Sequence, residues 1–108
     1  MSWQVLLTED AVRDLEEIIH YLDIHESPDR ADHVLRQFEK VFDSLSENPR
    51  RGVFPTELQA VGLREYRETF FKPYRVIYRV EGERIFVMLI ADGRRDMQTL
   101  LLRRLLDG

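Results

Sequence analysis

The chain of 108 residues contains no cysteine, and it has only 5 glycines and 4 prolines. Without cysteine it can form neither disulfide bonds nor thiolate metal sites, which suits a protein of the cytoplasm. The longest apolar run, from Ile85 to Ala91, is far shorter than the ~20 residues of a membrane-spanning helix. No charged leader followed by an apolar stretch is present, so no signal peptide is expected. We therefore expect one cytoplasmic domain, residues 1–108, without a membrane segment, repeats or linkers.

Charge is distributed unevenly along the chain. The net charge is −4, but residues 1–48 carry 12 acidic and 4 basic side chains, whereas residues 49–108 carry 8 acidic and 12 basic ones. Such asymmetry suggests two surfaces with different partners. The alternative is an acidic helical face balanced by an arginine-rich sheet, with no partner involved.

Periodicity predicts two helices in the acidic half. Thr8 is a suitable N-cap before two acidic residues, and apolar residues follow at helical spacing, so residues 9–25 should form an amphipathic helix. Ser27, followed by proline, signals a second helix that ends near Asn48. Because the link between the two helices is so short, they should form an antiparallel hairpin.

Strands are expected on both sides of this hairpin in the sequence. A short strand precedes it, and after a loop over residues 49–62 an antiparallel meander of three strands follows. The four strands are residues 3–7, 63–71, 74–80 and 84–91. The last strand is apolar on both faces, which indicates cover on both sides, and the leucine-rich residues 97–106 form a short helix or an extended tail. This order predicts an α+β fold with the helical hairpin packed on an antiparallel sheet.

Two groups of titratable side chains do not form a convincing site. His20, His25 and His33 lie on the expected helices without metal-site spacing, so we expect them on the solvated surface and predict no metal or cofactor. The acidic residues of the first helix lie at its start, where the helix dipole favours them, or opposite its apolar stripe. We expect a solvated face rather than catalytic carboxylates for Glu9, Asp10, Asp14, Glu16 and Glu17.

The arginines of the expected sheet form a more distinctive pattern. Arg75 and Arg79 point to the same face because strand side chains alternate, and Arg67 could join them from the neighbouring strand. Arg94 and Arg95 follow the last strand. Converging guanidinium groups can bind phosphate bidentately and, in an RNA-cleaving site, stabilise charge on phosphorus. Alternatively, the arginines pair with nearby glutamates, namely Glu65, Glu68, Glu81 or Glu83.

The order and spacing of several short motifs are similar to those of a known family. The motifs are TEDAVRDLEEIIHYL, NPRRG after the second helix, GLREY, YRVIYRV and IADGRRD. From about residue 5 to residue 96 the chain resembles the RelE/ParE superfamily of type II toxins, sometimes described as plasmid stabilisation proteins. The resemblance implies a helical hairpin on an antiparallel sheet and a cognate antitoxin that neutralises the toxin. It also implies binding to operator DNA only through the toxin–antitoxin complex.

The two branches of this superfamily differ in mechanism. RelE-like members cleave mRNA in the ribosome without a metal, whereas ParE-like members bind DNA gyrase and trap it. Arg75 and Arg95 match the catalytic arginines of the RelE-like branch, but they also occur in much of the ParE-like branch. The RelE-like C-terminal tyrosine falls on Leu101 and a strand lysine falls on Glu68, so partners for proton transfer are missing. A net charge of −4 also fits a protein partner better than dense RNA phosphate.

The sequence therefore favours a ParE-like toxin that inhibits gyrase by binding and is neutralised by a cognate antitoxin, with a homodimer or a heterotetramer as possible assemblies. One alternative is a RelE-like mRNA endoribonuclease with Arg75 and Arg95 as catalytic residues. Another is a non-toxic co-regulator that only binds the antitoxin. The residues expected to contact the target or the antitoxin are Arg67, Arg79, Arg94, Leu101 and Leu105.

Overall fold

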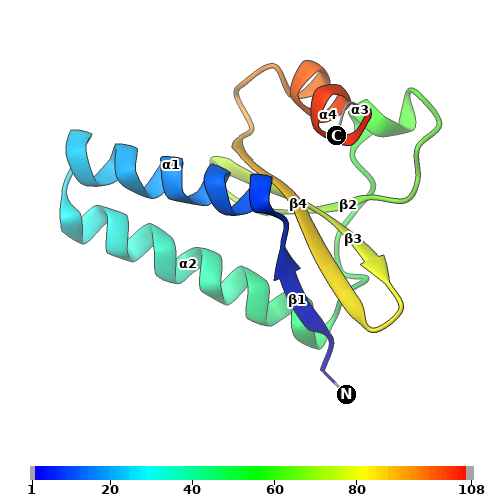
Figure 1. Cartoon of the computed structure of the whole chain (residues 1–108), viewed down its shortest axis with the longest axis horizontal. Helices are drawn as coiled ribbons and strands as arrows, with labels where there is room; N and C mark the ends of the chain where they lie inside the picture. Colours follow the sequence, from blue (N-terminus) through cyan, green and yellow to red (C-terminus); the bar gives the residue numbers. More distant parts are fainter. Residues whose placement is uncertain (1, 107–108) are drawn as a thin grey trace.

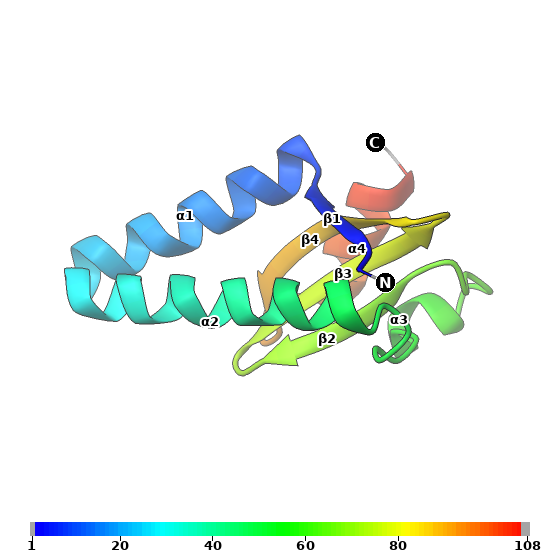
Figure 2. The same cartoon turned by 90° about the horizontal axis from the view of Figure 1, so that it is seen from below.

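The computed structural model describes residues 2–106, which form three layers (Figures 1 and 2). The elements are β1 (Gln4–Leu7), α1 (Glu9–His25), α2 (Pro28–Glu47), α3 (Thr56–Gln59), β2 (Arg67–Phe71), β3 (Tyr74–Glu81), β4 (Arg84–Asp92) and α4 (Met97–Leu106). The hairpin of α1 and α2 covers one face of the sheet, and α3 and α4 lie over the other. The α+β fold and the helical hairpin are thus confirmed. None of the helices within residues 2–106 combines the length and apolar character needed to cross a bilayer.

Local signals set the ends of the two long helices. The Thr8 hydroxyl accepts a hydrogen bond from the Ala11 N–H (3.1 Å), and the Ser27 hydroxyl accepts one from the Arg30 N–H (3.0 Å). Each bond satisfies a backbone donor of the first turn that has no partner within the helix. Pro28 occupies the start of α2, where its missing N–H costs nothing. The predicted starts of both helices are therefore correct.

The sheet has the order β1-β4-β3-β2 and is mixed rather than wholly antiparallel. β3 pairs antiparallel with both β2 and β4, as the meander predicted, whereas β1 pairs parallel with β4. The strand predicted over residues 63–71 begins only at Arg67, and the predicted loop over residues 49–62 contains the short helix α3. Leu58 and Tyr66 of this segment are buried in the core on the α4 side, and the segment pairs with the sheet only through the isolated bridge between Val53 and Glu68.

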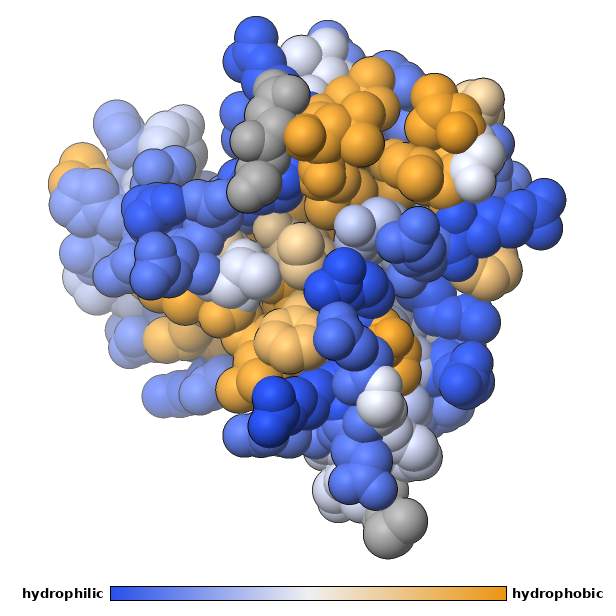
Figure 3. All heavy atoms as spheres, turned by 45° about the vertical axis from the view of Figure 1, so that its right-hand side comes forward, coloured by the Kyte–Doolittle hydropathy of each residue, from blue (hydrophilic) through white to orange (hydrophobic). Residues whose placement is uncertain are grey.

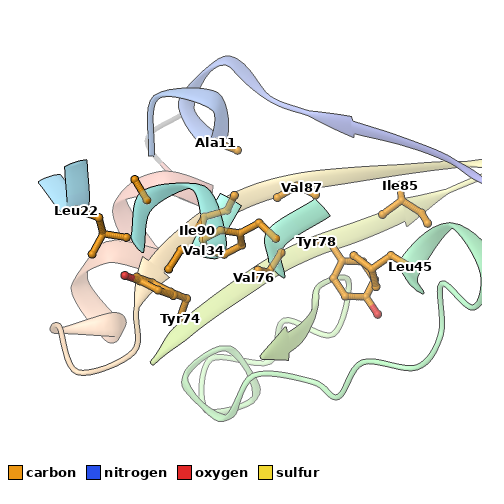
Figure 4. Packing of buried hydrophobic residues seen from close by; sticks show 12 residues of the cluster. Ala11, Leu22, Val34, Leu45, Tyr74, Val76, Tyr78, Ile85, Val87 and Ile90 are labelled. Carbon is orange, nitrogen blue, oxygen red and sulfur yellow. The ribbon is translucent and has the colours of Figure 1, made fainter. Parts of the chain in front are cut away.

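Two hydrophobic cores lie on opposite faces of the sheet. The larger one fills the space between the helical hairpin and the sheet (Figure 4). Its buried residues include Ala11, Leu22, Val34, Phe38, Leu45, Val76, Tyr78, Ile85, Val87 and Ile90. The second core lies beneath α3 and α4 and contains Leu58, Tyr66, Ile77, Leu89, Ala91, Met97 and Leu101. Strand alternation sends neighbouring residues to different cores, which confirms that both faces of the last strand are covered.

A buried tyrosine fastens the loop after α2 to the sheet. The Tyr78 hydroxyl donates to the Pro49 carbonyl (2.8 Å) and accepts from the Gly52 N–H (3.0 Å). Burial raises the pKa of the Tyr78 hydroxyl, so it stays protonated and can donate. A Cβ at residue 52 would lie only 2.4 Å from this hydroxyl oxygen, so the close approach requires glycine. Arg50 and Arg51, which precede Gly52, are thereby placed near the start of β2.

Asp14 does not belong to a solvated acidic face, contrary to the prediction. Its carboxylate accepts a hydrogen bond from the Ile90 N–H (3.0 Å) and two from the Arg104 guanidinium (2.8 and 2.9 Å). Arg104 also donates to the Met88 carbonyl (2.8 Å), at the bulge of β4. The pair therefore satisfies backbone groups on the part of β4 that β1 does not reach, because β1 pairs only up to residue 87.

Candidate functional site

Arg75 lies in a dense ion-pair cluster on the α4 side of the sheet. Its Nε and Nη2 donate to the two carboxylate oxygens of Glu68 (both 2.7 Å), and its Nη1 and Nη2 donate to those of Glu57 (both 2.8 Å). Of the five N–H donors in a guanidinium, four are therefore engaged. Glu68 reaches Arg75 as a diagonal neighbour across the strands, since Phe70 stands directly opposite Arg75.

The hydrogen bonds between Arg75 and Glu57 favour the charged form of both groups. The hydrogen bonds from Arg75 lower the pKa of the Glu57 carboxyl, and those to Glu57 raise the pKa of Arg75. The Arg75 side chain is 13% exposed and that of Glu68 only 4%. Phosphate could reach Arg75 only by displacing carboxylates that hold it bidentately on both sides. The alternative suggested by the sequence, in which the arginines pair with glutamates, is thus correct for Arg75, and Glu68 is one of the glutamates that were named.

A pH dependence of stability follows from the lowered pKa of Glu57. The contribution of this carboxylate is present above its ordinary pKa of 4.5 and is lost as the pH falls through the lower pKa of the folded state. We therefore expect the free energy of unfolding, measured by urea denaturation, to decrease as the pH is lowered below about 5. Glu57→Gln should reduce this fall, because the variant has no carboxylate to protonate at this position. An unchanged slope in the variant would contradict the assignment.

Arg67 does not share the sheet face of Arg75 and Arg79, contrary to the suggestion from the sequence. It pairs with Tyr78, whose side chain lies in the core on the helical side. Its guanidinium lies 4.5 Å from the centre of the Phe54 ring, and Nη1 donates to the Gly52 carbonyl (2.9 Å). Arg67 is therefore held by the loop after α2 rather than by the sheet.

Arg67 and Arg79 nevertheless border a common hollow, which we call the basic depression. It has a volume of about 440 Å³ and is lined by Arg50, Phe54, Arg64, Glu65, Arg67, Arg79 and Val80. Arg79 donates from Nη2 to Glu81 (2.9 Å), a second pairing that the sequence anticipated. Arg75 does not line this depression.

Arg94 and Arg95 lie at a different place. Both line a hollow of about 410 Å³ between α1 and the end of the sheet, together with Tyr21, Leu22, Tyr74 and other residues. Arg94 is exposed and pairs with Asp92, which lowers the pKa of that carboxyl. Arg75 does not line this hollow either, so the two arginines proposed for catalysis do not face one cavity.

Leu101 is a core residue and not the surface residue that the sequence prediction assumed. It is fully buried in the second core, and Leu105 is partly buried against the same core. Residues 97–106 thus form a helix, one of the two forms expected for this segment, and pack against the sheet. Apolar side chains do gather at the surface over α3 and α4 (Figure 3), where Leu106 is 64% and Val61 49% exposed.

The three histidines are exposed on the helical hairpin, as predicted. Within residues 2–106, no three histidine, aspartate or glutamate side chains are grouped so that they could hold a metal ion. The member of the Arg75 cluster that the sequence interpretation missed is Glu57, on the four-residue helix α3. Pro55 followed by threonine and glutamate is a helix-start signal, but so short a helix shows no periodicity. Nothing in the sequence points from Glu57 to Arg75.

Comparisons with known proteins agree with this fold. Residues 5–97 match the family described as ParE toxin of type II toxin–antitoxin system, parDE. Toxin ParE3 of Caulobacter vibrioides is 31% identical over 98 residues, which cover 91% of this chain and 94% of that protein.

Solved structures of low sequence identity share the same architecture. The chromosomal ParDE system of P. aeruginosa aligns with a TM-score of 0.68 at 17% identity, over 84% of this chain and 96% of that chain. A mutant of the E. coli toxin RelE in the free state aligns with a TM-score of 0.63 at 15% identity, over 98% of this chain and 100% of that one. These likenesses support the fold, while the family match and the identity to ParE3 decide the family. The chain belongs to the ParE toxin family of type II toxin–antitoxin systems.

Proposed function

We propose that this protein is a toxin that inhibits DNA gyrase by binding to it, acts in the cytoplasm, and is neutralised by a cognate antitoxin. The observation that carries the proposal is the engagement of Arg75 by Glu57 and Glu68. An arginine held on both sides by carboxylates is poorly suited to stabilise charge on a phosphate during RNA cleavage. It is well suited to hold a surface in a fixed shape.

The remaining residues of the nuclease alternative support the same choice. Leu101 stands where a RelE-like enzyme would have its tyrosine, and it is fully buried and has no proton to transfer. Glu68 stands at the expected lysine position and neutralises Arg75 instead of adding positive charge. Arg95 lines a separate hollow with Arg94. A binding mechanism needs none of these groups to act on a substrate.

An antitoxin partner is supported by the family and by the kind of solved structures that resemble the chain. The ParDE structure is of a toxin–antitoxin system, and a further neighbour, with a TM-score of 0.56, is the toxin–antitoxin complex RelBE2 of Mycobacterium tuberculosis. We infer that this chain is likewise bound by an antitoxin, in a heterotetramer or another assembly, and that operator DNA is contacted through that complex.

Two assays on the purified protein test the proposal. We expect inhibition of supercoiling by gyrase and no cleavage of ribosome-bound mRNA. The informative control is Arg95→Ala, because Arg95 is exposed and its loss leaves the cores and the Arg75 cluster intact. The RelE-like alternative would be right if the protein cleaved mRNA and did not inhibit gyrase, and if Arg95→Ala abolished the cleavage. Antitoxin binding with neither activity would point to a non-toxic co-regulator.

A further inference from the structure

We propose that the basic depression is the binding site for an acidic segment of the antitoxin, whose carboxylates pair with Arg50, Arg64, Arg67 and Arg79. The proposal rests on the toxin–antitoxin part of the proposed function and is independent of gyrase as the target. It is carried by three properties of the depression: a preorganised cation, an unpartnered buried donor, and two arginines without carboxylate partners.

Arg67 supplies the preorganised cation. Its Nη1 donates to the carbonyls of Gly52 (2.9 Å) and Arg50 (3.4 Å), and its guanidinium rests on the Phe54 ring at 4.5 Å from the centroid. These contacts fix the orientation of the group but do not neutralise its charge, because the acceptors are uncharged carbonyls. Its Nη2 and Nε make none of these bonds, so a planar fork remains for a carboxylate at little further cost in side-chain entropy.

Arg79 supplies the unpartnered donor. Its Nε is shielded from solvent and has no hydrogen-bond acceptor, and no other side-chain nitrogen or oxygen within residues 2–106 shares that condition. A buried donor without an acceptor costs about 1–3 kcal/mol, so native proteins keep few of them. The donor belongs to a residue that lines the depression, where an incoming carboxylate would supply the missing acceptor.

Arg50 and Arg64 complete the site from the loops on either side of Phe54. Both are exposed, and within residues 2–106 neither forms a salt bridge. This separates them from Arg75, Arg94 and Arg104, each of which is paired with a carboxylate of this chain. Their charges are therefore available to a partner.

Charge and shape favour a protein segment over nucleic acid as the occupant. The lining of the depression contains four arginines and Glu65, and Arg79 pairs with the nearby Glu81, so the local excess is only two positive charges. Duplex DNA carries one phosphate charge per about 1.7 Å of its axis, and next to this site it would meet those two carboxylates. A peptide can place one or two carboxylates in a hollow of about 440 Å³ and lay its aliphatic stems on Phe54 and Val80.

The test uses the full chain and NMR, since the arginine Nε–H signals report directly on the site. Octaglutamate and a 12-base-pair DNA duplex serve as separate probes at low salt. We expect octaglutamate to shift the Nε–H signal of Arg79 and to bind more tightly than the duplex. We also expect the signal to shift in the complex purified with the antitoxin.

The variant Arg50→Gln/Arg64→Gln removes two charges without touching a hydrogen bond of the fold, and it should weaken octaglutamate binding about tenfold. The matched control is Arg36→Gln/Arg103→Gln, which removes the same charge from exposed positions on α2 and α4 and should have little effect. If both variants weakened octaglutamate binding equally, the effect would depend only on net charge, and the proposal would be overturned. So would tighter binding of the duplex, or an Arg79 signal that the antitoxin leaves unshifted.

Discussion

Replacing Arg75 by alanine should lower the free energy of unfolding by about 3 to 5 kcal/mol, measured by urea denaturation at pH 7. The reason is that the change leaves Glu57 and Glu68, which are 21% and 4% exposed, without the cation that holds them. Two nearby carboxylates in a largely buried place repel each other and lose their hydrogen bonds together.

The prediction has an internal rescue and a control. Adding Glu68→Gln to Arg75→Ala should recover part of the loss, because it removes the more deeply buried charge. Arg79→Ala should cost less than about 1 kcal/mol, because the ion pair of Arg79 is with an exposed glutamate. If Arg75→Ala were as stable as Arg79→Ala, the cluster would have no structural role.

The expected instability of Arg75→Ala affects how toxicity experiments should be interpreted. Loss of toxicity in Arg75→Ala would have the same appearance whether Arg75 were catalytic or structural, because the variant is also expected to be unstable. Arg95→Ala separates the two possibilities, since Arg95 is exposed. A toxin that remains active with Arg95→Ala and loses activity with Arg75→Ala would agree with a structural role for the cluster.

The second large effect is expected for Asp14→Ala, which should cost about 2 to 3 kcal/mol and lower Tm by roughly 10 °C. The change removes the acceptor of the Ile90 N–H and both hydrogen bonds to Arg104, whose side chain is 20% exposed. It therefore loosens α1, β4 and α4 at one point. Calorimetry on the purified variant measures the shift.

Asp10→Ala is the matched control for Asp14→Ala. Asp10 lies on the same helix and is 3.8 Å from Arg104, but its side chain is 47% exposed. We expect an effect below about 0.5 kcal/mol. A Tm for Asp14→Ala within 2 °C of that of Asp10→Ala would contradict a structural role for the Asp14–Arg104 pair.

Arg75 and Asp14 show which features the sequence could predict and which it could not. Alternation correctly placed Arg75 and Ile77 on one face and Val76 and Tyr78 on the other, because the side chains of a strand alternate whatever surrounds it. Register across strands has no such local rule. It sets Arg67 opposite Tyr78, and so separates Arg67 from the face that the sequence suggested.

Local sequence patterns also could not predict which carboxylates pair with Arg75 and Arg104. Glu57 meets Arg75 across 18 positions of sequence, and Asp14 meets Arg104 across 90. Asp14 follows the helical rule for a surface acid. The backbone group that it binds, the Ile90 N–H, is available only because β1 ends at Leu7, which pairs with Val87 of β4. Burial of Leu101 follows in the same way from the placement of α4 over the sheet.

The sequence by itself determined the starts of the two long helices, the alternation of the strands, the α+β order and the likeness to RelE/ParE toxins. These depend on caps, periods and turns, which act over a few residues. Only the tertiary structure decided which arginines are free. The free energy of a guanidinium depends on the acceptors that distant segments bring to it, and those gave Arg75 two carboxylates while Arg50 and Arg64 received none.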